Sequence, residues 1–277
     1  MKDMFSYNEV VRKMRFFFQE AKGFTEVPAQ SRQSILAACE DPATISQYIF
    51  GGTNWPLPQT GQMWLERELL ENPEVEGVFC ITTSYRNEPN PIPGRHDKIF
   101  PMFEFESHGD MDDMIRLEEE LLTHLGFGKS LDFSNIKYND AATKYAVSEL
   151  DVDEEEKLCS DYTDCTFLTH FPQRTHPFWN MKQSNVDPDL FHKVDIIMHG
   201  METIGSAERS TNVEEMRHQF HNISDGEYAN LLFNHFGKKR VEDELEEYLS
   251  LDMFGRFGGG IGVTRMVRAM KLQGLLN

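Results

Sequence analysis

Residues 83–106 have the sequence TSYRNEPNPIPGRHDKIFPMFEFE, and this stretch decides the expected fold. Two β-prone segments, 77–86 and 98–107, overlap the two ends of this stretch, and a loop of prolines and charged residues separates them. The second segment alternates in polarity, which is typical of a strand with one buried face. We therefore expect two strands joined by a long loop.

Before and after these two strands, strand-like segments alternate irregularly with helix-like segments along the chain. This pattern predicts one α+β domain over residues 1–277, built on an antiparallel sheet flanked by helices. The acidic run at 151–157 is interpreted as a solvated face. The other expected helices lie at 5–22, 34–40, 61–71, 112–127, 212–222 and 226–236, with one more within 138–160 beside the acidic run. The other expected strands lie at 24–27, 167–172, 176–182 and 192–206, and a glycine turn is expected to open into a helix at 254–273.

Charge and composition exclude several classes of protein. The net charge is −19 and the only short basic run is 238–240, which argues against DNA and counts against RNA as the main partner. No apolar run is long enough to span a membrane, and the N-terminus lacks a signal peptide, so we expect a cytoplasmic protein. The cysteines, which form no CxxC pair and are expected to be reduced thiols, are Cys39, Cys80, Cys159 and Cys165.

The first candidate site lies in the loop between the two strands. Paired strands place Arg86 and Glu88 at the start of the loop, and Arg95 and His96 on its returning limb. Arginine binds phosphate or carboxylate through a planar fork of charge-assisted hydrogen bonds. The loop therefore suits a triphosphate, and ordinary surface ion pairs, worth about 0–1 kcal/mol each, are the alternative.

A second candidate site lies in KVDIIMHGMETIGSAERS, residues 193–210. A tight turn at 199–200 places Glu202 across from Ile197 and puts Asp195 on the same face, one diagonal away. Diagonal neighbours on paired strands are about 7–8 Å apart. Two carboxylates at that distance can hold hard cations when phosphate oxygens complete the shell. A polar hairpin at a sheet edge is the alternative.

A third candidate site is the glycine-rich segment GRFGGGIGVTR, residues 255–265. Its glycines, which include Gly260 and Gly262, leave room for a ligand against the backbone. The N-terminal amides of the following helix can face an anion, and Arg265 lies one turn inside that helix. A glycine turn before a helix is a weak signal when taken alone.

Taken in order, these segments resemble the catalytic core of class II aminoacyl-tRNA synthetases of the aspartate, asparagine and lysine subgroup, most of all the asparaginyl enzymes. GFTEV resembles the first motif of that family, SYRNE…GRHDKIFPMFEFE the second and GGGIGVTRMV the third. VDIIMHGMETIGSAER resembles its metal-binding strand pair, and HPFWNM and IKYNDA also fit the group. The resemblance covers nearly the whole chain and departs at Ile99 and Thr264, where the family usually has glutamate.

The resemblance implies an adenylate-forming reaction with ATP and Mg²⁺ as cofactors. Arg86 would bridge the α-phosphate of ATP and the carboxylate of the amino acid, and it would act with Arg265 as a catalytic residue. Asp195 and Glu202 would bind Mg²⁺, and the adenine would lie between Phe100 and Arg265. The implied ATP site comprises Arg86, Glu88, Arg95, His96, Phe100, Glu202, Gly260, Gly262 and Arg265.

The resemblance also implies an amino-acid site made by Gln62, Glu66, Glu104 and Arg209. Gln62 would help to hold the α-amino group, and Arg209 would meet a side-chain oxygen of the substrate. The aspartate enzymes place a lysine near the position of Glu66. A carboxylate there accepts from an amide and repels a carboxylate, which favours asparagine, or an aspartate whose product is asparagine-like. A helical surface residue is the alternative for Glu66.

We therefore expect an ATP-dependent ligase that activates asparagine or aspartate and transfers it to a small-molecule or protein acceptor, as standalone asparagine synthetases of this fold do. The first motif forms the dimer seam in this family, which implies a homodimer. The family's N-terminal OB-fold barrel, which reads the anticodon, has no room before a helix that begins near residue 5. A minimal tRNA ligase that acts on the acceptor end, and a non-catalytic regulatory module, are the alternatives, so tRNA stays open as a partner.

Overall fold

The computed structural model describes residues 3–29, 33–38 and 42–276. The strands are β1 (Thr25–Glu26), β2 (Gln47–Phe50), β3 (Thr53–Pro56), β4 (Gly77–Tyr85), β5 (Ile99–His108), β6 (Ser134–Lys137), β7 (Cys165–Pro172), β8 (Leu190–Met198), β9 (Glu202–Glu208) and β10 (Arg256–Gly262). The α-helices are α1 (Met4–Arg15), α2 (Gln62–Glu71), α3 (Met111–Leu125), α4 (Tyr138–Tyr145), α5 (Val152–Asp161), α6 (Val213–Asn222), α7 (Glu227–Phe236), α8 (Lys238–Leu249) and α9 (Val263–Leu272).

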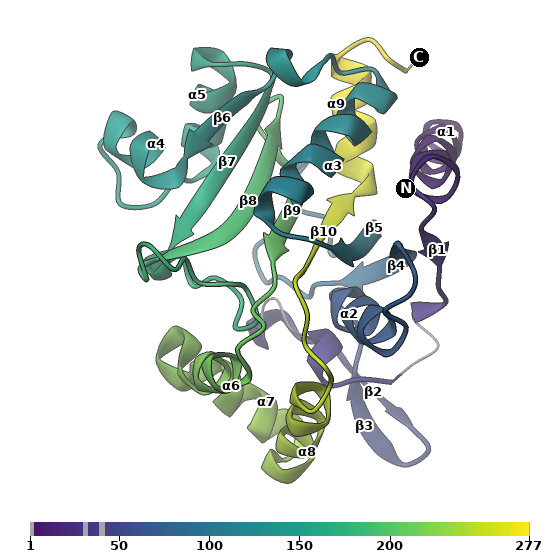
Figure 1. Cartoon of the computed structure of the whole chain (residues 1–277), viewed down its shortest axis with the longest axis vertical. Coiled ribbons are helices and arrows are strands. Elements are labelled where there is room, and N and C mark those ends of the chain that lie inside the picture. Colours follow the sequence, from purple (N-terminus) through teal and green to yellow (C-terminus); the bar gives the residue numbers. More distant parts are fainter. Residues whose placement is uncertain (1–2, 30–32, 39–41, 277) are drawn as a thin grey trace.

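An eight-stranded sheet of order β1-β4-β5-β10-β9-β8-β7-β6 forms the centre of the molecule (Figure 1). The inner strands pair antiparallel, whereas β1 is parallel to β4 and β6 is parallel to β7 at the two edges. Helices α3 and α9 cross one face of the sheet, and α6, α7 and α8 gather beyond one end of it (Figure 1). This arrangement confirms the expected α+β class with a mostly antiparallel sheet and flanking helices.

The side chains of strand β5 alternate between an apolar face of the sheet and a polar face. Phe103 and Phe105 belong to the main apolar cluster, which also contains side chains of α1, α3 and α9. Between and beyond them, Glu104 and Glu106 are fully buried and hydrogen-bond to the segment before α2 and to Arg209. The period of two along a strand therefore directs carboxylates to the face opposite the apolar core.

Both expected strand pairs are present, and the second has the expected register. Tyr85 pairs with Ile99 at the loop end of β4 and β5. Glu202 pairs with Ile197, and the turn between β8 and β9 is closed by hydrogen bonds between Met198 and Met201. Both local predictions are confirmed, because each depends on a turn between strands that are neighbours in the sequence.

Several element predictions were wrong. The glycines of 258–260 lie within β10, which pairs on both sides, and do not form a turn. The region 138–160, expected to hold one helix and an acidic run, holds two helices, α4 and α5, and the acidic run lies on the second of them. The segment 176–182 forms no strand, although Met181 makes an isolated bridge. Helix α8 was not predicted. The helix expected at 34–40 is a single 3-10 turn at Leu36–Ala38, with Cys39 and residue 40 outside the described part. The segment 5–22 is helical as expected, although it continues beyond α1 as a π-helix over Phe16–Ala21.

The glycines of β10 have a packing reason that the local sequence does not contain. A Cβ atom at Gly258 would lie 2.0 Å from the carboxyl carbon of Glu106 on the neighbouring strand. A Cβ at Gly259 would lie 2.7 Å from the Cβ of Ser206 on the other side. Glycine is therefore required here by the bulk of the neighbouring strands rather than by a turn.

Glu118 on α3 is a buried carboxyl group without a cationic partner among the interactions of the described residues. Burial raises the pKa of Glu118 to about 8, Ser206 opposes this rise, and Asp195 adds to it. An unfolded glutamate has a pKa near 4.3, so from about pH 4.5 to pH 8 the folded form keeps a proton that the unfolded form releases. The free energy of unfolding should therefore fall through this window, by up to about 1.4 kcal/mol per pH unit.

The variant Glu118→Gln tests this expectation. Glutamine cannot ionise, so the variant should be more stable than the unaltered protein at pH 7–8, and its stability should depend less on pH. Urea denaturation of both proteins between pH 5 and pH 8 measures the difference. Parallel pH profiles would show that Glu118 is ionised in the folded state.

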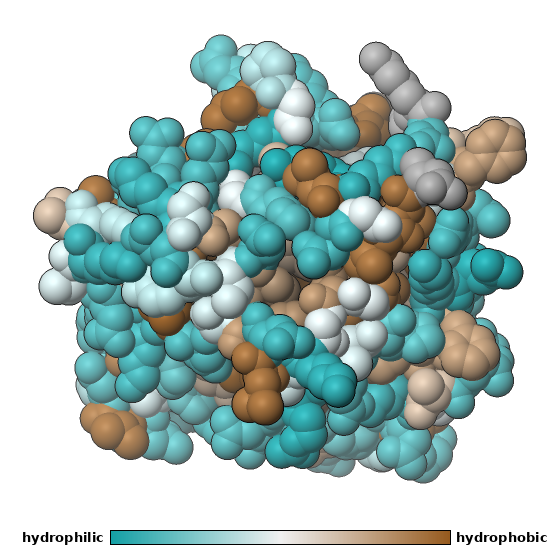
Figure 2. Space-filling model, turned by 90° about the horizontal axis from the view of Figure 1, so that it is seen from above, coloured by the Kyte–Doolittle hydropathy of each residue, from teal (hydrophilic) through white to brown (hydrophobic). Residues whose placement is uncertain are grey.

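The face that Figure 2 displays is largely hydrophilic, with some apolar side chains gathered near the hollow at its centre. This agrees with the net charge of −19. Within the part of the chain that the structure describes, no helix has the length and apolar character needed to cross a membrane.

Candidate active site

Two adjoining cavities lie on the polar side of the sheet. The first, which we call the nucleotide cavity after the ligand that the sequence predicts for its residues, has a volume of about 190 Å³ and lies between the loop after β4, strand β10 and the start of α9. The second, which we call the amino-acid cavity for the same reason, has a volume of about 430 Å³ and extends to the segment 175–178 and to α7. Arg86, Glu202 and Gly205 line both cavities, so the two spaces meet at these residues.

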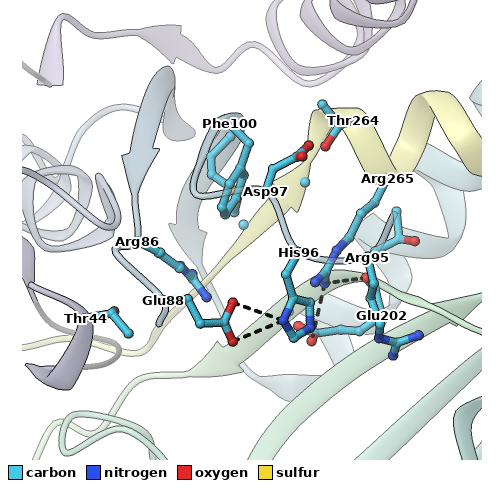
Figure 3. A pocket seen from close by; sticks show the side chains of 15 residues that line it. Thr44, Arg86, Glu88, Arg95, His96, Asp97, Phe100, Glu202, Thr264 and Arg265 are labelled. Atoms are coloured by element: carbon cyan, nitrogen blue, oxygen red, sulfur yellow. Dashed lines mark hydrogen bonds and ion pairs between the residues drawn. The ribbon is translucent and has the colours of Figure 1, made fainter. Parts of the chain in front are cut away.

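All residues expected at the ATP site line the nucleotide cavity. They come from the loop between β4 and β5, from β5 itself, from β9 and from the segment where β10 leads into α9 (Figure 3). The residues are Arg86, Glu88, Arg95, His96, Phe100, Glu202, Gly260, Gly262 and Arg265. The structure thus brings together three segments that are far apart in the sequence.

Arginine and histidine side chains of this cavity have defined partners. The guanidinium carbon of Arg86 lies 5.6 Å from the ring centroid of Phe100. His96 Nδ1 lies 3.0 Å from the Glu88 carboxylate. Arg265 Nη1 donates to the Glu202 carbonyl oxygen at 2.7 Å, and Figure 3 shows its side chain on the opposite side of the cavity from Arg86. Arg86 and Arg265, two of the three arginines that line the cavity, therefore come from different elements and lie on opposite sides of it.

Asp195 lies in the amino-acid cavity and is almost fully buried. Its Oδ2 accepts a hydrogen bond from Lys193 Nζ at 2.7 Å, while its Oδ1 has no partner among the described residues. A Cβ atom at Gly205 would lie 3.4 Å from Asp195 Oδ1 and 3.0 Å from Glu202 Oε1, so the two carboxylates face one space. Burial raises the pKa of Asp195 to about 7, Lys193 opposes this rise, and Glu202 adds to it.

An unpartnered, buried carboxylate oxygen beside a second carboxylate suits a hard cation. The pair does not form a complete cage, because the described residues contain no group of three or more histidine, cysteine or acidic side chains placed to hold a metal. A cation here would therefore need further oxygen ligands, which phosphate groups supply.

Of the residues expected at the amino-acid site, Gln62 and Arg209 line the amino-acid cavity. Arg209 is 2% exposed, and its Nη2 donates to Glu106 Oε1 at 2.5 Å. Its Nε also lies 3.5 Å from Glu66 Oε1. Burial raises the pKa of Glu106 to about 8, and Arg209 opposes that rise.

Glu66 lines neither cavity, and it is not a surface residue either, because it is 1% exposed. It accepts hydrogen bonds from Asn180 Nδ2 at 2.6 Å, Tyr248 Oη at 2.6 Å and Arg256 Nη2 at 2.8 Å. Although burial opposes ionisation, the charges of Arg209 and Arg256 lower its pKa. Glu66 therefore supports Arg209 from behind instead of facing the cavity.

Glu104 also lines neither cavity. It is fully buried and accepts hydrogen bonds from the hydroxyls of Thr60 and Thr82 and, at 2.8 Å, from the backbone N–H of Gly61. Gly61 immediately precedes α2, so Glu104 fixes the start of the helix that carries Gln62.

Sequence reasoning missed three charged residues around the site. Glu106 holds Arg209, and its position two residues after Glu104 on the same strand face was the available signal. Arg256 is fully buried against Glu66, and nothing in its local sequence indicates this. Glu155 belongs to the acidic run expected to be a solvated face, yet it is largely buried and pairs with Arg95.

The mostly antiparallel sheet with its flanking helices matches the catalytic-core fold of the class II synthetases. The family model for class II tRNA synthetases for aspartate, lysine and asparagine (D, K and N) matches residues 1–274, and the chain belongs to this family.

Named relatives are distant in sequence. The chain is 24% identical to the asparagine–tRNA ligase of Pelotomaculum thermopropionicum over 94% of its own length and 63% of the relative. It is 23% identical to the lysine–tRNA ligase of Campylobacter hominis, over 93% of the chain and 59% of the relative. The chain thus spans less than two thirds of the length of these relatives.

Solved structures share the fold. The asparaginyl-tRNA synthetase of Pyrococcus horikoshii in complex with asparaginyl-adenylate superposes with a TM-score of 0.76 at 21% identity, covering 96% of this chain and 64% of that one. The asparaginyl-tRNA synthetase of Entamoeba histolytica gives a TM-score of 0.75 at 19% identity, covering 97% of this chain and 63% of that one.

Proposed function

We propose that this chain is an ATP- and Mg²⁺-dependent ligase that activates asparagine or aspartate as an aminoacyl-adenylate and transfers it to a small-molecule or protein acceptor. The observation that carries the proposal is the junction of the two cavities at Arg86 and Glu202. A nucleotide phosphate in one cavity and an amino acid carboxylate in the other would both lie within reach of Arg86.

Positioning and charge neutralisation suffice for such a reaction. The carboxylate oxygen of the amino acid attacks the α-phosphorus of ATP, the bond between that phosphorus and the β-phosphate oxygen breaks, and pyrophosphate leaves. Arg86 would neutralise charge on both reactants and hold them in line, while Arg265 would bind the nucleotide. No general acid, general base or protein nucleophile is needed for this step.

Asp195 and Glu202 are the residues that would hold Mg²⁺, because their oxygens face one space and Asp195 Oδ1 lacks a partner among the described residues. When bound, the ion would supply positive charge to the phosphates. Glu88, Arg95, His96 and Phe100 would bind the remaining parts of ATP, and this assignment follows from their place on the cavity wall.

The amino-acid side chain would meet Arg209, with Gln62 near the α-amino group. Arg209 already has two carboxyl groups beside it, those of Glu106 and Glu66. An aspartate side chain would bring a further negative charge to this place, whereas the amide of asparagine would not. Asparagine is therefore the first candidate and aspartate the second. The structures with bound asparaginyl-adenylate belong to proteins of the same fold, which supports the adenylate class of intermediate.

A minimal tRNA ligase is the second candidate function. Family membership favours it, since the named relatives are tRNA ligases. The net charge of −19 favours a small or protein acceptor instead, because polyanions are repelled. The proposal places the protein in the cytoplasm, in agreement with the free thiols of Cys80, Cys159 and Cys165. It also makes the protein a homodimer whose two copies meet through α1 and β1, and light scattering of the purified protein tests whether it is a dimer.

Amino-acid-dependent ATP–pyrophosphate exchange tests the proposal. Purified protein, ATP and Mg²⁺ are incubated with each amino acid in turn, and exchange is expected with asparagine or aspartate above all others. AMP release on addition of ammonia, an amine, a peptide or tRNA then identifies the acceptor class. If none of the amino acids supports exchange, the proposal is overturned. If tRNA is the only acceptor that accelerates AMP release, the second candidate function is selected.

A further inference from the structure

One glutamate of the acidic run 151–157 contacts residues that line the nucleotide cavity. The side chain of Glu155, on α5, is 18% exposed, although its neighbour Glu156 is exposed. Glu155 Oε2 accepts hydrogen bonds from Arg95 Nη2 and, at 3.2 Å, from the backbone N–H of Glu202. One carboxylate therefore joins α5 to two residues that line the nucleotide cavity.

Arg95 is held from two directions. Its Nη2 donates to Glu155, its Nη1 donates to the Gly200 carbonyl oxygen at 3.1 Å, and its side chain is 10% exposed. A guanidinium group has five N–H donors, so these two contacts leave others directed elsewhere. Since Arg95 also lines the nucleotide cavity, it can keep both contacts and still present donors to a phosphate.

The turn that carries Glu202 rests on the same helix. Gly200 N donates to Cys159 Sγ at 3.1 Å, one helical turn after Glu155. A Cβ atom at Gly200 would lie 3.2 Å from the Cα of Glu156, so α5 packs closely against the turn. The position of Glu202 at the junction of the two cavities therefore depends on α5.

We propose that Glu155 is a positioning residue of the nucleotide site, which holds Arg95 in the orientation that binds the distal phosphates of a nucleoside triphosphate. The inference rests on the proposed function. Arginine has high rotamer freedom, and ordering it before the ligand arrives removes that cost from binding.

The variant Glu155→Gln removes the charge of the carboxylate and nearly keeps its shape. Glutamine retains a carbonyl oxygen that can accept from the N–H of Glu202, but it loses the charge that holds Arg95. The expected result is a rise of about tenfold in KM for ATP and in Kd for ATP–Mg²⁺ by titration calorimetry, as for a lost hydrogen bond to a charged group. The kcat and the KM for the amino acid should change less than about twofold, and Glu155→Asp, which keeps the charge, should lie between.

A double variant and a matched control complete the experiment. If Glu155 acts through Arg95, then adding Glu155→Gln to Arg95→Met should weaken ATP binding by less than about twofold further. Glu156→Gln removes the same charge from the exposed neighbour and should leave ATP binding unchanged. If Glu155→Gln does not fold, Arg95→Met gives the same measurement through the other partner.

Two outcomes overturn the inference in distinguishable ways. Equal or tighter ATP binding by Glu155→Gln, with normal binding by the unaltered protein, would overturn this inference alone. Absence of ATP binding by the unaltered protein would overturn the proposed function and this inference together.

Discussion

Replacing Arg86 by alanine is expected to reduce ATP–pyrophosphate exchange by at least about 10³-fold. Arg86 lines both cavities, so its loss removes one cation from the place where the two reactants meet. The reaction as proposed has no other acid or base to compensate, because charge neutralisation and alignment lower its barrier. Exchange is measured with saturating ATP and the preferred amino acid, at equal protein concentrations.

Two further variants make this result interpretable. Arg86→Lys keeps the charge but not the planar fork, and it should retain only part of the activity. Arg116→Ala removes an exposed arginine that pairs with Asp113 on α3, far from the cavities in sequence, and should exchange normally. Near-normal exchange by Arg86→Ala would reject the assignment of this site.

Replacing Arg256 by alanine is expected to lower the free energy of unfolding by about 3–5 kcal/mol. Arg256 is fully buried, and its guanidinium donates to Glu66 Oε2 at 2.8 Å and to Tyr248 Oη at 2.6 Å. Removing the arginine of a buried ion pair leaves its partner, here the carboxylate of Glu66, desolvated and short of a counter-charge. Urea denaturation followed by circular dichroism measures the loss.

An arginine at the surface provides the control for this variant. Arg67 pairs with Glu71 and Glu247 at the outside of α2, where ion pairs contribute about 0–1 kcal/mol, so Arg67→Ala should change stability by no more than that. A loss below about 1 kcal/mol for Arg256→Ala would mean that the buried cluster relaxes around the missing charge.

The nucleotide cavity could be predicted from the sequence because its parts are local. Arg86 directly follows β4 and Phe100 lies on β5, two strands that one loop joins, while Asp195 and Glu202 lie on strands joined by one turn. Register within each pair follows from alternation and turn length, so the order of residues along the chain is enough to assign their faces. The likeness to family motifs then ordered the three segments around one ligand.

The supporting residues could not be predicted, because their partners are distant in sequence. Glu66 meets Arg256 across 190 positions, and Arg95 meets Glu155 across 60. A buried glutamate on a helix has the same local sequence as an exposed one, and the difference lies in the arginines that other elements bring to it. The glycines at 258–260 were misassigned for the same reason, since the bulk of Glu106 on the next strand decides their role.

The arrangement behind Arg209 has a consequence for attempts to redesign substrate preference. Glu66 and Glu106 pair with two arginines, Arg209 and Arg256, so the ionisable groups beneath the pocket depend on one another as a set of four. Changing one member to admit a cationic or larger amino acid would strand its counter-charge in the interior. Laboratory evolution of a new specificity should therefore proceed through paired, charge-conserving exchanges on α2, β5, β10 and the segment after β9, and not through single replacements.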